Sequence, residues 1–535
     1  MKGARMRRIL FALSLAAALS ACGPTNSNPP PDTGVSDDAP PTADAIVADE
    51  GSDAAVPDSP VADAATDARD AQAGDASADG SSAPFITEAL DCRFDAPGGP
   101  GSGDMQRHSL DLTRFPDALC NDGTGAVLHF RPARGAANRN KWVISLRGGG
   151  SCISGIDCAS RYCGCSNARA AMCPGIPAEN RTNFTADNMS NTVAALLPGR
   201  GVILRDGGPT MVNPLADYNH VYLQYCTSDV WSGTRRDAVL DGVHPRTGAP
   251  LRYRVHFLGS RVLDADIATL RRDGVSALVH AGTATQMPDL DDAEEVVFTG
   301  DSAGGIGLVQ NLDRLATTLR ASNTRCAGAT CPLRVSSLID ASTGPDMSRL
   351  DFSMTDFGTY ATFLSRNWAA QTTYWGVRTD ESCVEYHRSR SPGSESSCSD
   401  FSHTIRHHVT SPFFVRMALL DGLIFETYRS LGLRDSMMGP LSGMVFAQTL
   451  GRELAGFPML STTAEEGASI RTPSGVFAPL CTDHDTIFED VEVYGTSITL
   501  AGTTYKLFDV FDPWRTAGTA RAIVPLTPTA TTCRM

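Results

Sequence analysis

Residues 295–319 constrain the fold of this chain more than any other segment. Residues 295–299 are apolar and β-branched, which is typical of a short buried strand. The chain then reads Gly300-Asp301-Ser302-Ala303-Gly304-Gly305, and residues 306–319 carry apolar side chains at helical spacing. A buried strand that turns sharply into a helix favours an α/β fold with a mostly parallel central sheet flanked by helices.

The turn between this strand and this helix predicts a nucleophilic serine. Strand, G-x-S-x-G and helix in this order form the nucleophile elbow of α/β-hydrolases, which exposes the serine on a strained turn. Only small residues fit two positions before and after Ser302, at Gly300 and Gly304, and the helix N-terminus favours developing negative charge. The alternative is a tight glycine-rich turn around a buried serine. A trypsin-like G-D-S-G-G is excluded because Ala303 intervenes.

A second glycine-rich turn lies upstream. Residues 141–146 read as a strand that runs into Arg147-Gly148-Gly149-Gly150-Ser151-Cys152. α/β-Hydrolases place there a loop whose backbone N–H groups stabilise the oxyanion of the tetrahedral intermediate. We therefore predict an oxyanion hole formed by Gly149, Gly150 and Ala303. A flexible loop and a phosphate cradle are the alternatives, but the Lys-Ser/Thr of a P-loop is absent.

The base is expected after the serine and after the acid in chain order. His484 lies in a loop that follows the short apolar stretch 476–480. Its neighbours Asp483 and Asp485 are interpreted as loop-capping or solvated groups. A triad histidine belongs in such a loop, and a solvated loop histidine is the alternative. Residues 403–408 contain three further histidines in a polar segment, which predicts an exposed face: His403, His407 and His408.

Two aspartates compete for the role of the acid. Residues 413–420 read as a strand that ends at Asp421, where a buried carboxylate is costly unless it is paired. Asp340 ends the apolar stretch 335–339 and is the rival, but the order of Ser302, Asp421 and His484 favours Asp421. In this hypothesis the histidine is the general base, the aspartate orients it, and an acyl-serine forms. No metal or organic cofactor is needed.

The N-terminus reads as an export signal over residues 1–22. A basic start precedes an apolar run, 9–19, that is too short for a stable membrane span. Leu19-Ser20-Ala21-Cys22 resembles the lipobox of bacterial lipoproteins, in which Cys22 is lipidated and anchors the chain to a membrane. The alternative is an ordinary signal peptide with an incidental cysteine.

Residues 23–84 form an acidic stretch rich in Pro, Ala and Asp. Thirteen acidic residues stand against Arg69, and no aromatic residue is present. Such a segment cannot bury enough apolar surface to offset its ordering entropy, so we expect a disordered tether. It contributes −12 to the formal net charge of −15. The sequence contains no basic stripe interleaved with aromatic residues, so nothing in it suggests nucleic-acid binding. Residues 85–535 are expected to form one α/β-hydrolase domain.

The chain contains 15 cysteines. Setting Cys22 aside leaves an even number, which in an exported protein predicts disulfides and disulfide-rich insertions. Four cysteines crowd one short segment: Cys158, Cys163, Cys165 and Cys173. A zinc site is the alternative for them, but the segment lacks two well-spaced C-x-x-C pairs. Cys163 and Cys165 are too close to bond each other comfortably, so each should pair elsewhere.

Five segments together resemble the pectin acetylesterase/Notum carboxylesterase family, over about residues 115–500. They are Cys120-Asn121-Asp122-Gly123-Thr124 leading to the glycine turn, residues 221–233, residues 300–307, Leu420-Asp421, and Cys481-Thr482-Asp483-His484. The second, VYLQYCTSDVWSG, is similar to the family's Y-C-x-S-D-x-W-x-G segment. The resemblance implies that Ser302, Asp421 and His484 form the triad and that Asp340 does not. Residues 225–231 are either a packed, disulfide-pinned segment or a direct substrate element.

The resemblance implies ester hydrolysis, and three departures bear on the substrate. Arg147 and Ser151 stand where the family usually has Glu and Trp, and Asp301 replaces a small residue or Cys. We expect an exported serine esterase of the cell envelope that deacetylates a polysaccharide such as pectin. The alternatives are a carboxylesterase for longer acyl or lipid esters and a non-catalytic surface binding protein. The carboxylesterase alternative includes enzymes of the hormone-sensitive-lipase family, but the His-Gly-Gly-Gly motif of that family is absent here.

Overall fold

The computed structural model of the chain describes most of the residues after position 82. The described ranges are 83–92, 100–271 without 183 and 185, 279–280, 283–284, 288–327, 330–435, 439–459, 473–525 and 530–533. The predicted signal, Cys22 and residues 23–82 of the predicted tether lie outside them. Within these ranges, no helix combines the length and the apolar character needed to cross a bilayer.

A ten-stranded sheet forms the centre of the fold. Its order is β19-β16-β13-β11-β10-β3-β5-β2-β1-β4. The seven strands from β19 to β5 are parallel, whereas β2, β1 and β4 are antiparallel. The strands are β1 (Met105–Ser109), β2 (Val127–Arg131), β3 (Lys141–Leu146), β4 (Leu196–Leu197), β5 (Asn219–Leu223), β10 (Glu295–Asp301), β11 (Arg334–Asp340), β13 (Phe413–Arg416), β16 (Gly475–Phe477) and β19 (Ala522–Ile523). The mostly parallel sheet is confirmed.

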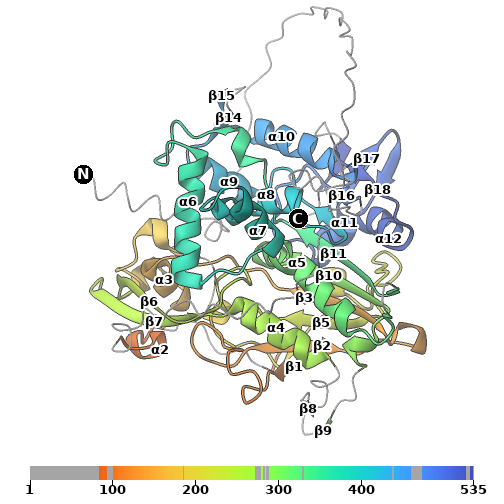
Figure 1. Cartoon of the computed structure of the whole chain (residues 1–535), viewed down its shortest axis with the longest axis horizontal. Helices are drawn as coiled ribbons and strands as arrows, with labels where there is room; N and C mark the ends of the chain where they lie inside the picture. Colours follow the sequence, from red (N-terminus) through yellow and green to blue (C-terminus); the bar gives the residue numbers. More distant parts are fainter. Residues whose placement is uncertain are drawn as a thin grey trace, which may run out of the picture. The chain divides into compact units, whose positions relative to one another are not determined.

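Helices cover both faces of the sheet because the side chains of a strand alternate between faces. Val296 and Phe298 of β10 share one core with helix α5 (Ala303–Ser322). Val297 packs into a second core with α12 (Leu507–Ala517). All residues of β10 are therefore buried, as expected for a central parallel strand. Figure 1 shows α12 beside β16 and, near α5, a group of helices from the later insertions.

The remaining elements are short or belong to insertions. The helices are α2 (Ile86–Ala89), α3 (Gly155–Tyr162), α4 (Gly259–Leu270), α6 (Tyr360–Ala370), α7 (Glu381–Arg390), α8 (Phe401–His407), α9 (Gly422–Ser430), α10 (Gly443–Ala455) and α11 (Asp490–Gly495). The other strands are β6 (Arg235–Val243), β7 (Pro250–Phe257), β8 (Val279–His280), β9 (Thr283–Ala284), β12 (Leu350–Asp351), β14 (Arg434–Asp435), β15 (Gly439–Pro440), β17 (Ser497–Leu500), β18 (Thr503–Tyr505) and β20 (Thr531–Thr532).

Seven disulfides join all the cysteines that follow Cys22. The pairs are Cys92–Cys163, Cys120–Cys226, Cys152–Cys158, Cys165–Cys173, Cys326–Cys331, Cys383–Cys398 and Cys481–Cys533. The predicted disulfide set is confirmed, and Cys163 and Cys165 pair with different partners as expected. This density of disulfides is typical of proteins that mature in an oxidising compartment.

Two local predictions were wrong. The strand expected over residues 413–420 ends at Arg416, because the chain then leaves β11 and follows the segment after β16 instead. The histidines expected on an exposed face are buried or half-buried, and His408 is 0% exposed. His403 and His408 pack against α7, which joins the neighbouring turn through the disulfide Cys383–Cys398.

Candidate active site

Ser302 occupies a strained turn between β10 and α5. Its φ of 49° lies in the left-handed region that non-glycine residues rarely adopt. A Cβ on Gly300 would lie 2.6 Å from the carbonyl oxygen of Gly304, so the turn closes only with a glycine at that position. The Ser302 N–H donates to the carbonyl of Asp340, 3.0 Å away, which fixes the turn to β11.

The imidazole of His484 joins Ser302 to Asp421. His484 Nε2 lies 2.9 Å from Ser302 Oγ, and its Nδ1 lies 2.7 Å from Asp421 Oδ2. Asp421 is fully buried, and its other oxygen caps α9 by accepting from Leu423 N and Ile424 N. The structure thus brings together three residues from distant parts of the chain in hydroxyl–imidazole–carboxylate order.

Backbone hydrogen bonds set the distance between Asp421 and His484. After β13, residues 417–422 run beside residues 477–482, and four amides of the first segment donate to carbonyls of the second. The pairs are Met417 with Phe477, Leu419 with Pro479, Leu420 with Cys481 and Gly422 with Thr482. The disulfide between Cys481 and Cys533 ties the same loop to the C-terminal segment. Both side chains therefore emerge from one paired backbone unit.

Asp340 lies at the end of β11 but does not contact His484. Its Oδ1 forms a buried ion pair with Arg416, 3.1 Å away, and both side chains are almost completely excluded from solvent. Its Oδ2 accepts from Thr486 N, Thr486 Oγ1 and Ile487 N at 2.9–3.0 Å. The rival acid is therefore an anchor for the loop that carries His484.

Asp485 contacts the imidazole as well. Its Oδ1 lies 2.9 Å from His484 Nε2, a contact that the interpretation of Asp485 as a loop-capping or solvated group did not include, while its side chain is 37% exposed. Burial alone lowers the pKa of His484, but the carboxylates of Asp421 and Asp485 outweigh it and hold the pKa well above its usual value. An acid directly after the histidine was the only sequence signal for this contact.

Asp301 connects the elbow to the glycine loop. Its buried Oδ1 accepts a hydrogen bond from Gly148 N at 2.7 Å. Burial raises the pKa of the Asp301 carboxyl well above its usual value, and the carboxylates of Asp485 and Asp340 raise it further. Asp301, which directly precedes Ser302, therefore holds the start of the glycine loop against the elbow.

Two carbonyls of the glycine loop accept hydrogen bonds from buried side chains. Gly149 and Gly150 have positive φ values of 140° and 61°. The Gly149 carbonyl accepts from the Arg161 guanidinium, and the Gly150 carbonyl accepts from Tyr225 OH at 2.7 Å. In a trans peptide the N–H of the next residue points opposite to the carbonyl. The N–H groups of Gly150 and Ser151 therefore point away from these two donors.

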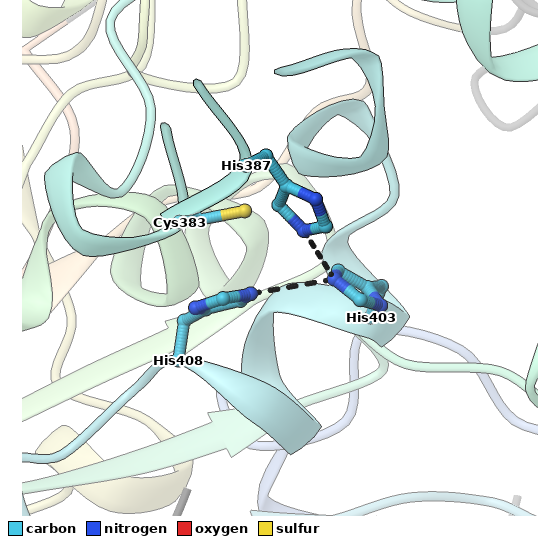
Figure 2. A group of neighbouring side chains, drawn as sticks. All are labelled: Cys383, His387, His403 and His408. Atoms are coloured by element: carbon cyan, nitrogen blue, oxygen red, sulfur yellow. Dashed lines mark hydrogen bonds between the residues drawn. The ribbon is translucent and has the colours of Figure 1, made fainter. Parts of the chain in front are cut away.

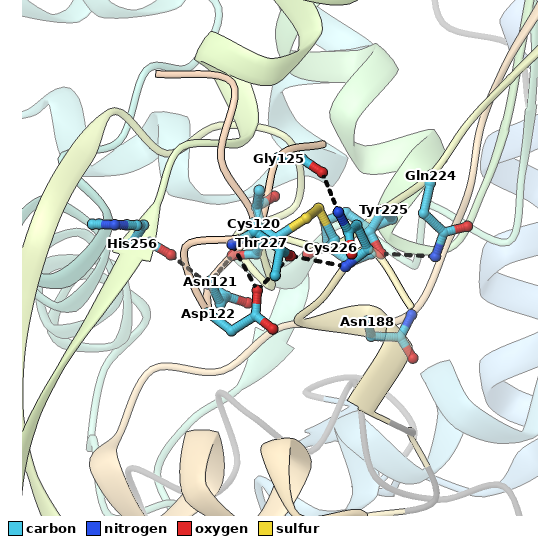
Figure 3. Close-up of a disulfide and its surroundings, with 12 residues drawn as sticks. Cys120, Asn121, Asp122, Gly125, Asn188, Gln224, Tyr225, Cys226, Thr227 and His256 are labelled. Carbon is cyan, nitrogen blue, oxygen red and sulfur yellow. Dashed lines mark hydrogen bonds between the residues drawn. A yellow bond between two sulfur atoms is a disulfide. The ribbon is translucent and has the colours of Figure 1, made fainter. Parts of the chain in front are cut away.

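The segment that most resembles the known family is packed rather than exposed. The disulfide Cys120–Cys226 pins it, and Asn121 Nδ2 donates to the carbonyls of Thr227 and His256 (Figure 3). Tyr225 and Trp231 are both 0% exposed. The packed interpretation of these two aromatic residues is confirmed, whereas Val230 between them lines a cavity.

This cavity opens beside Ser302. Its volume is about 100 Å³, and Gly150, Ser302 and Ala303 form part of its wall. Most of the remaining wall is apolar and comes from α5, α6, α9 and their neighbours: Ile153, Ile306, Met347, Phe363, Trp375, Phe401, Ile424 and Leu431. Two polar groups of the wall are turned to the backbone, since Trp375 Nε1 donates to Cys152 O and Tyr428 OH donates to Pro345 O. The side-chain oxygens of Gln310 and Gln371, also in the wall, are buried without a hydrogen-bond partner among the described residues.

The sheet topology and the elbow geometry define a protein of α/β-hydrolase type. The chain belongs to the pectinacetylesterase family, because the family model described as Pectinacetylesterase matches residues 102–514.

Curated relatives agree with this assignment, and a solved structure shares the fold. Palmitoleoyl-protein carboxylesterase NOTUM of Schmidtea mediterranea is 30% identical over 215 residues, 39% of this chain and 31% of the relative. The notum1' protein of Xenopus laevis is 26% identical over 403 residues, 74% of this chain and 66% of the relative. Palmitoleoyl-protein carboxylesterase NOTUM of Homo sapiens is 24% identical over 405 residues, which are 74% of this chain and 64% of the relative. The matches thus span less than two thirds of each relative. The solved structure of the Wnt deacylase Notum from Drosophila has the same fold, with a TM-score of 0.50, 21% identity and coverage of 79% of this chain and 95% of that one.

Proposed function

We propose that this chain is a serine carboxylic-ester hydrolase that works through an acyl-serine at Ser302. The observation that carries the proposal is the imidazole of His484, which lies within hydrogen-bond distance of both Ser302 Oγ and Asp421 Oδ2. A hydroxyl becomes an effective nucleophile when an adjacent base removes its proton during attack. The buried Asp421 orients the imidazole and stabilises the cationic form that follows.

The proposed reaction proceeds in two halves. Ser302 Oγ attacks the ester carbonyl carbon while His484 Nε2 takes the hydroxyl proton. The carbonyl oxygen becomes an oxyanion, which the backbone N–H groups of Gly149, Gly150 and Ala303 are proposed to stabilise. Ala303 is the first residue of α5, so its N–H has no acceptor within the helix. The C–O bond then breaks, and His484 returns the proton to the leaving alcohol. Water repeats the sequence on the acyl-serine and releases the acid.

The cavity beside Ser302 supports an acyl group longer than acetyl. An acetyl methyl reaches only the atoms next to the nucleophile, whereas this wall extends to α6 and α9. Its apolar lining would bury further methylene groups, each contributing about 0.8 kcal/mol when removed from water. The relatives named palmitoleoyl-protein carboxylesterases favour the same assignment. The alternative, deacetylation of a polysaccharide such as pectin, is favoured by the description of the family.

The location of the enzyme is part of the proposal. The seven disulfides support export to an oxidising compartment. Lipidation of Cys22 would anchor the domain to a membrane of the cell envelope through the acidic tether. The proposed partners are therefore an acylated substrate and the membrane that holds the anchor.

A chain-length series on nitrophenyl esters tests the proposal. The parent and the Ser302→Ala variant are compared on acetate, butyrate, octanoate and longer esters, with kcat/KM as the readout. We expect turnover by the parent that increases from acetate to octanoate, and loss of at least about 1000-fold in the variant. Turnover of acetate alone would favour the deacetylase. Absence of turnover on every ester by the folded parent would favour a binding protein.

A further inference from the structure

A second cluster of titratable side chains lies on α7 and α8. His387 is on α7, one helical turn after Cys383, and His403 lies on α8, which ends beside His408. The imidazoles of His387, His403 and His408 converge on one point between the two helices (Figure 2). The triad of Ser302, His484 and Asp421 uses none of these residues.

The distances between the converging nitrogens match those of a metal site. His403 Nε2 lies 3.1 Å from His387 Nε2 and 3.3 Å from His408 Nε2. In a tetrahedral zinc site, Zn–N bonds of about 2.0–2.1 Å place neighbouring ligand nitrogens about 3.3–3.4 Å apart. Both measured separations are therefore close to the spacing between ligands of one zinc ion, and all the candidate ligand atoms of the cluster lie within 4.8 Å of one another.

Hydrogen bonding among the imidazoles accounts poorly for this arrangement. Each Nε2 carries either one N–H or one lone pair in the plane of its ring. His403 Nε2 faces two nitrogens of the same kind, so a single proton or a single lone pair must serve both contacts. A cation at the common point removes the conflict, because all three lone pairs can then point toward it.

We propose that His387, His403 and His408 bind one Zn²⁺ ion through their Nε2 atoms, with water as the fourth ligand. Neutral imidazoles suit zinc and similar late transition metals, whereas Mg²⁺ and Ca²⁺ require oxygen ligands. Cys383 lies beside the cluster, but its sulfur is bonded to Cys398 and is not a thiolate ligand. The half-buried side chains of His387 and His403 leave the ion a path to the site, whereas His408 is fully buried.

The zinc ion would fix part of the wall of the cavity beside Ser302. Asp400 caps the start of α8, and its neighbours Ser399 and Phe401 line that cavity. The proposed ligands lie on both sides of this turn, with His387 on α7 and the other two at α8. Zinc therefore joins α7 to α8 behind the cavity wall, which is a structural role independent of the ester chemistry.

Metal titration of the oxidised, full-length protein tests the proposal. Metal is first removed with a chelator and without reductant, and Zn²⁺ is then added against a chromophoric competitor. We expect one zinc ion per chain, no competition by a large excess of Mg²⁺ or Ca²⁺, and a higher thermal midpoint with zinc. Co²⁺ in its place should give the intense visible bands of a tetrahedral nitrogen and oxygen site. A protein that binds no zinc, or a Co²⁺ complex with octahedral spectra or a sulfur charge-transfer band, overturns the assignment.

Substitution of one ligand and of one matched histidine completes the test. His387→Ala removes a half-buried ligand, and we expect the affinity for zinc to fall by more than about 100-fold. Losing a residue that only hydrogen-bonds to a metal ligand lowers the affinity by about 10–100-fold, so a ligand should cost more. His244→Ala, a half-buried histidine of the β6–β7 hairpin, should bind zinc like the parent. Equal affinity in the parent and His387→Ala would overturn the site. If His387→Ala does not fold, the Co²⁺ spectrum of the parent decides.

Discussion

Oδ1 of Asp485 lies 2.9 Å from Nε2 of His484. The same nitrogen faces Ser302 Oγ at 2.9 Å, so a carboxylate and the proposed nucleophile share one side of the imidazole. The φ of 58° at Asp485 turns its backbone so that the side chain reaches the preceding residue. With Asp421 on Nδ1, the ring is held between two carboxylates, which favour its protonated form.

We predict that Asp485→Asn shifts the pH dependence of activity to lower pH. The proposed base must be neutral to accept the serine proton, so kcat/KM rises as the pH passes the pKa of His484. Asp485 raises that pKa, and its removal lowers it, so the acid limb moves down by about 0.5–1 pH unit for a partly exposed pair. Asparagine adopts a positive φ more readily than alanine does.

The matched control is Asp483→Asn, which removes the same charge from the residue on the other side of His484. Its effect on the limb should be smaller, because the carboxylate that contacts Nε2 of His484 is that of Asp485. The measurement is kcat/KM between pH 5 and 9 on a nitrophenyl ester. An Asp485→Asn limb that stays in place or moves upward contradicts the assigned contact.

Asp421 has two separable tasks, and two substitutions distinguish them. Its Oδ2 contacts the imidazole, whereas its Oδ1 caps α9. Asp421→Asn keeps a cap oxygen but disturbs the imidazole tautomer, so kcat should fall by about 10,000-fold with little change in stability. Asp421→Ala should lose similar activity and also about 1 kcal/mol of stability through the cap. Activity assays and denaturant unfolding of both variants check this, and substantial activity in either excludes Asp421 as the acid.

The local elements of the site could be predicted because their signals are contained in short segments. The strand expected over residues 141–146 has the bounds of β3, and the elbow follows from the apolar run, the glycines and the helical pattern. The choice of Asp421 over Asp340 relied on chain order and family resemblance. In the structure Asp421 contacts His484, and Asp340 anchors the loop.

The contacts that were missed depend on pairing between distant segments. The strand after Phe413 ends early because residues 417–422 bond to the loop before His484, and no local pattern contains that information. The polar segment with His403 and His408 is buried because α7 packs over it, held by Cys383–Cys398. The periodicity of a sequence describes one element at a time. The burial of His403 and His408 depends on the elements packed against them, so periodicity could not predict it.

The ion pair between Arg416 and Asp340 predicts a large stability effect. Arg416→Met leaves the Asp340 carboxylate buried without its cation, which should destabilise the fold by about 3–5 kcal/mol. The double variant with Asp340→Asn removes both charges and should recover part of this loss, since the remaining groups still meet Thr486 and Ile487. Denaturant unfolding with intact disulfides measures both. A double variant less stable than the single one contradicts this account.

Tyr225 is predicted to control the proposed oxyanion loop. Its OH donates to the Gly150 carbonyl and accepts from Val230 N, each at 2.7 Å. Tyr225→Phe frees the loop carbonyl, so kcat should fall by about 10-fold or more while KM changes little. Tyr253→Phe is the control, because this buried tyrosine donates to Gly155 O instead. Steady-state kinetics of both variants should show loss of kcat in the first alone; equal losses would indicate general destabilisation.

The apolar cavity predicts how chain-length preference can be changed. Ile306 lies on the first turn of α5 and lines the cavity close to Ser302, so Ile306→Phe adds volume where a longer acyl chain would lie. We expect kcat/KM for octanoate to fall by about 10–100-fold, because the chain loses one or more buried methylene sites. Acetate needs no deep cavity, so its turnover should change by less than about 3-fold. The octanoate-to-acetate ratio is the readout, and a control substitution outside the cavity, Val491→Phe, should leave it unchanged because Val491 is exposed on α11. A ratio that stays constant in Ile306→Phe would mean that the acyl chain does not enter this cavity.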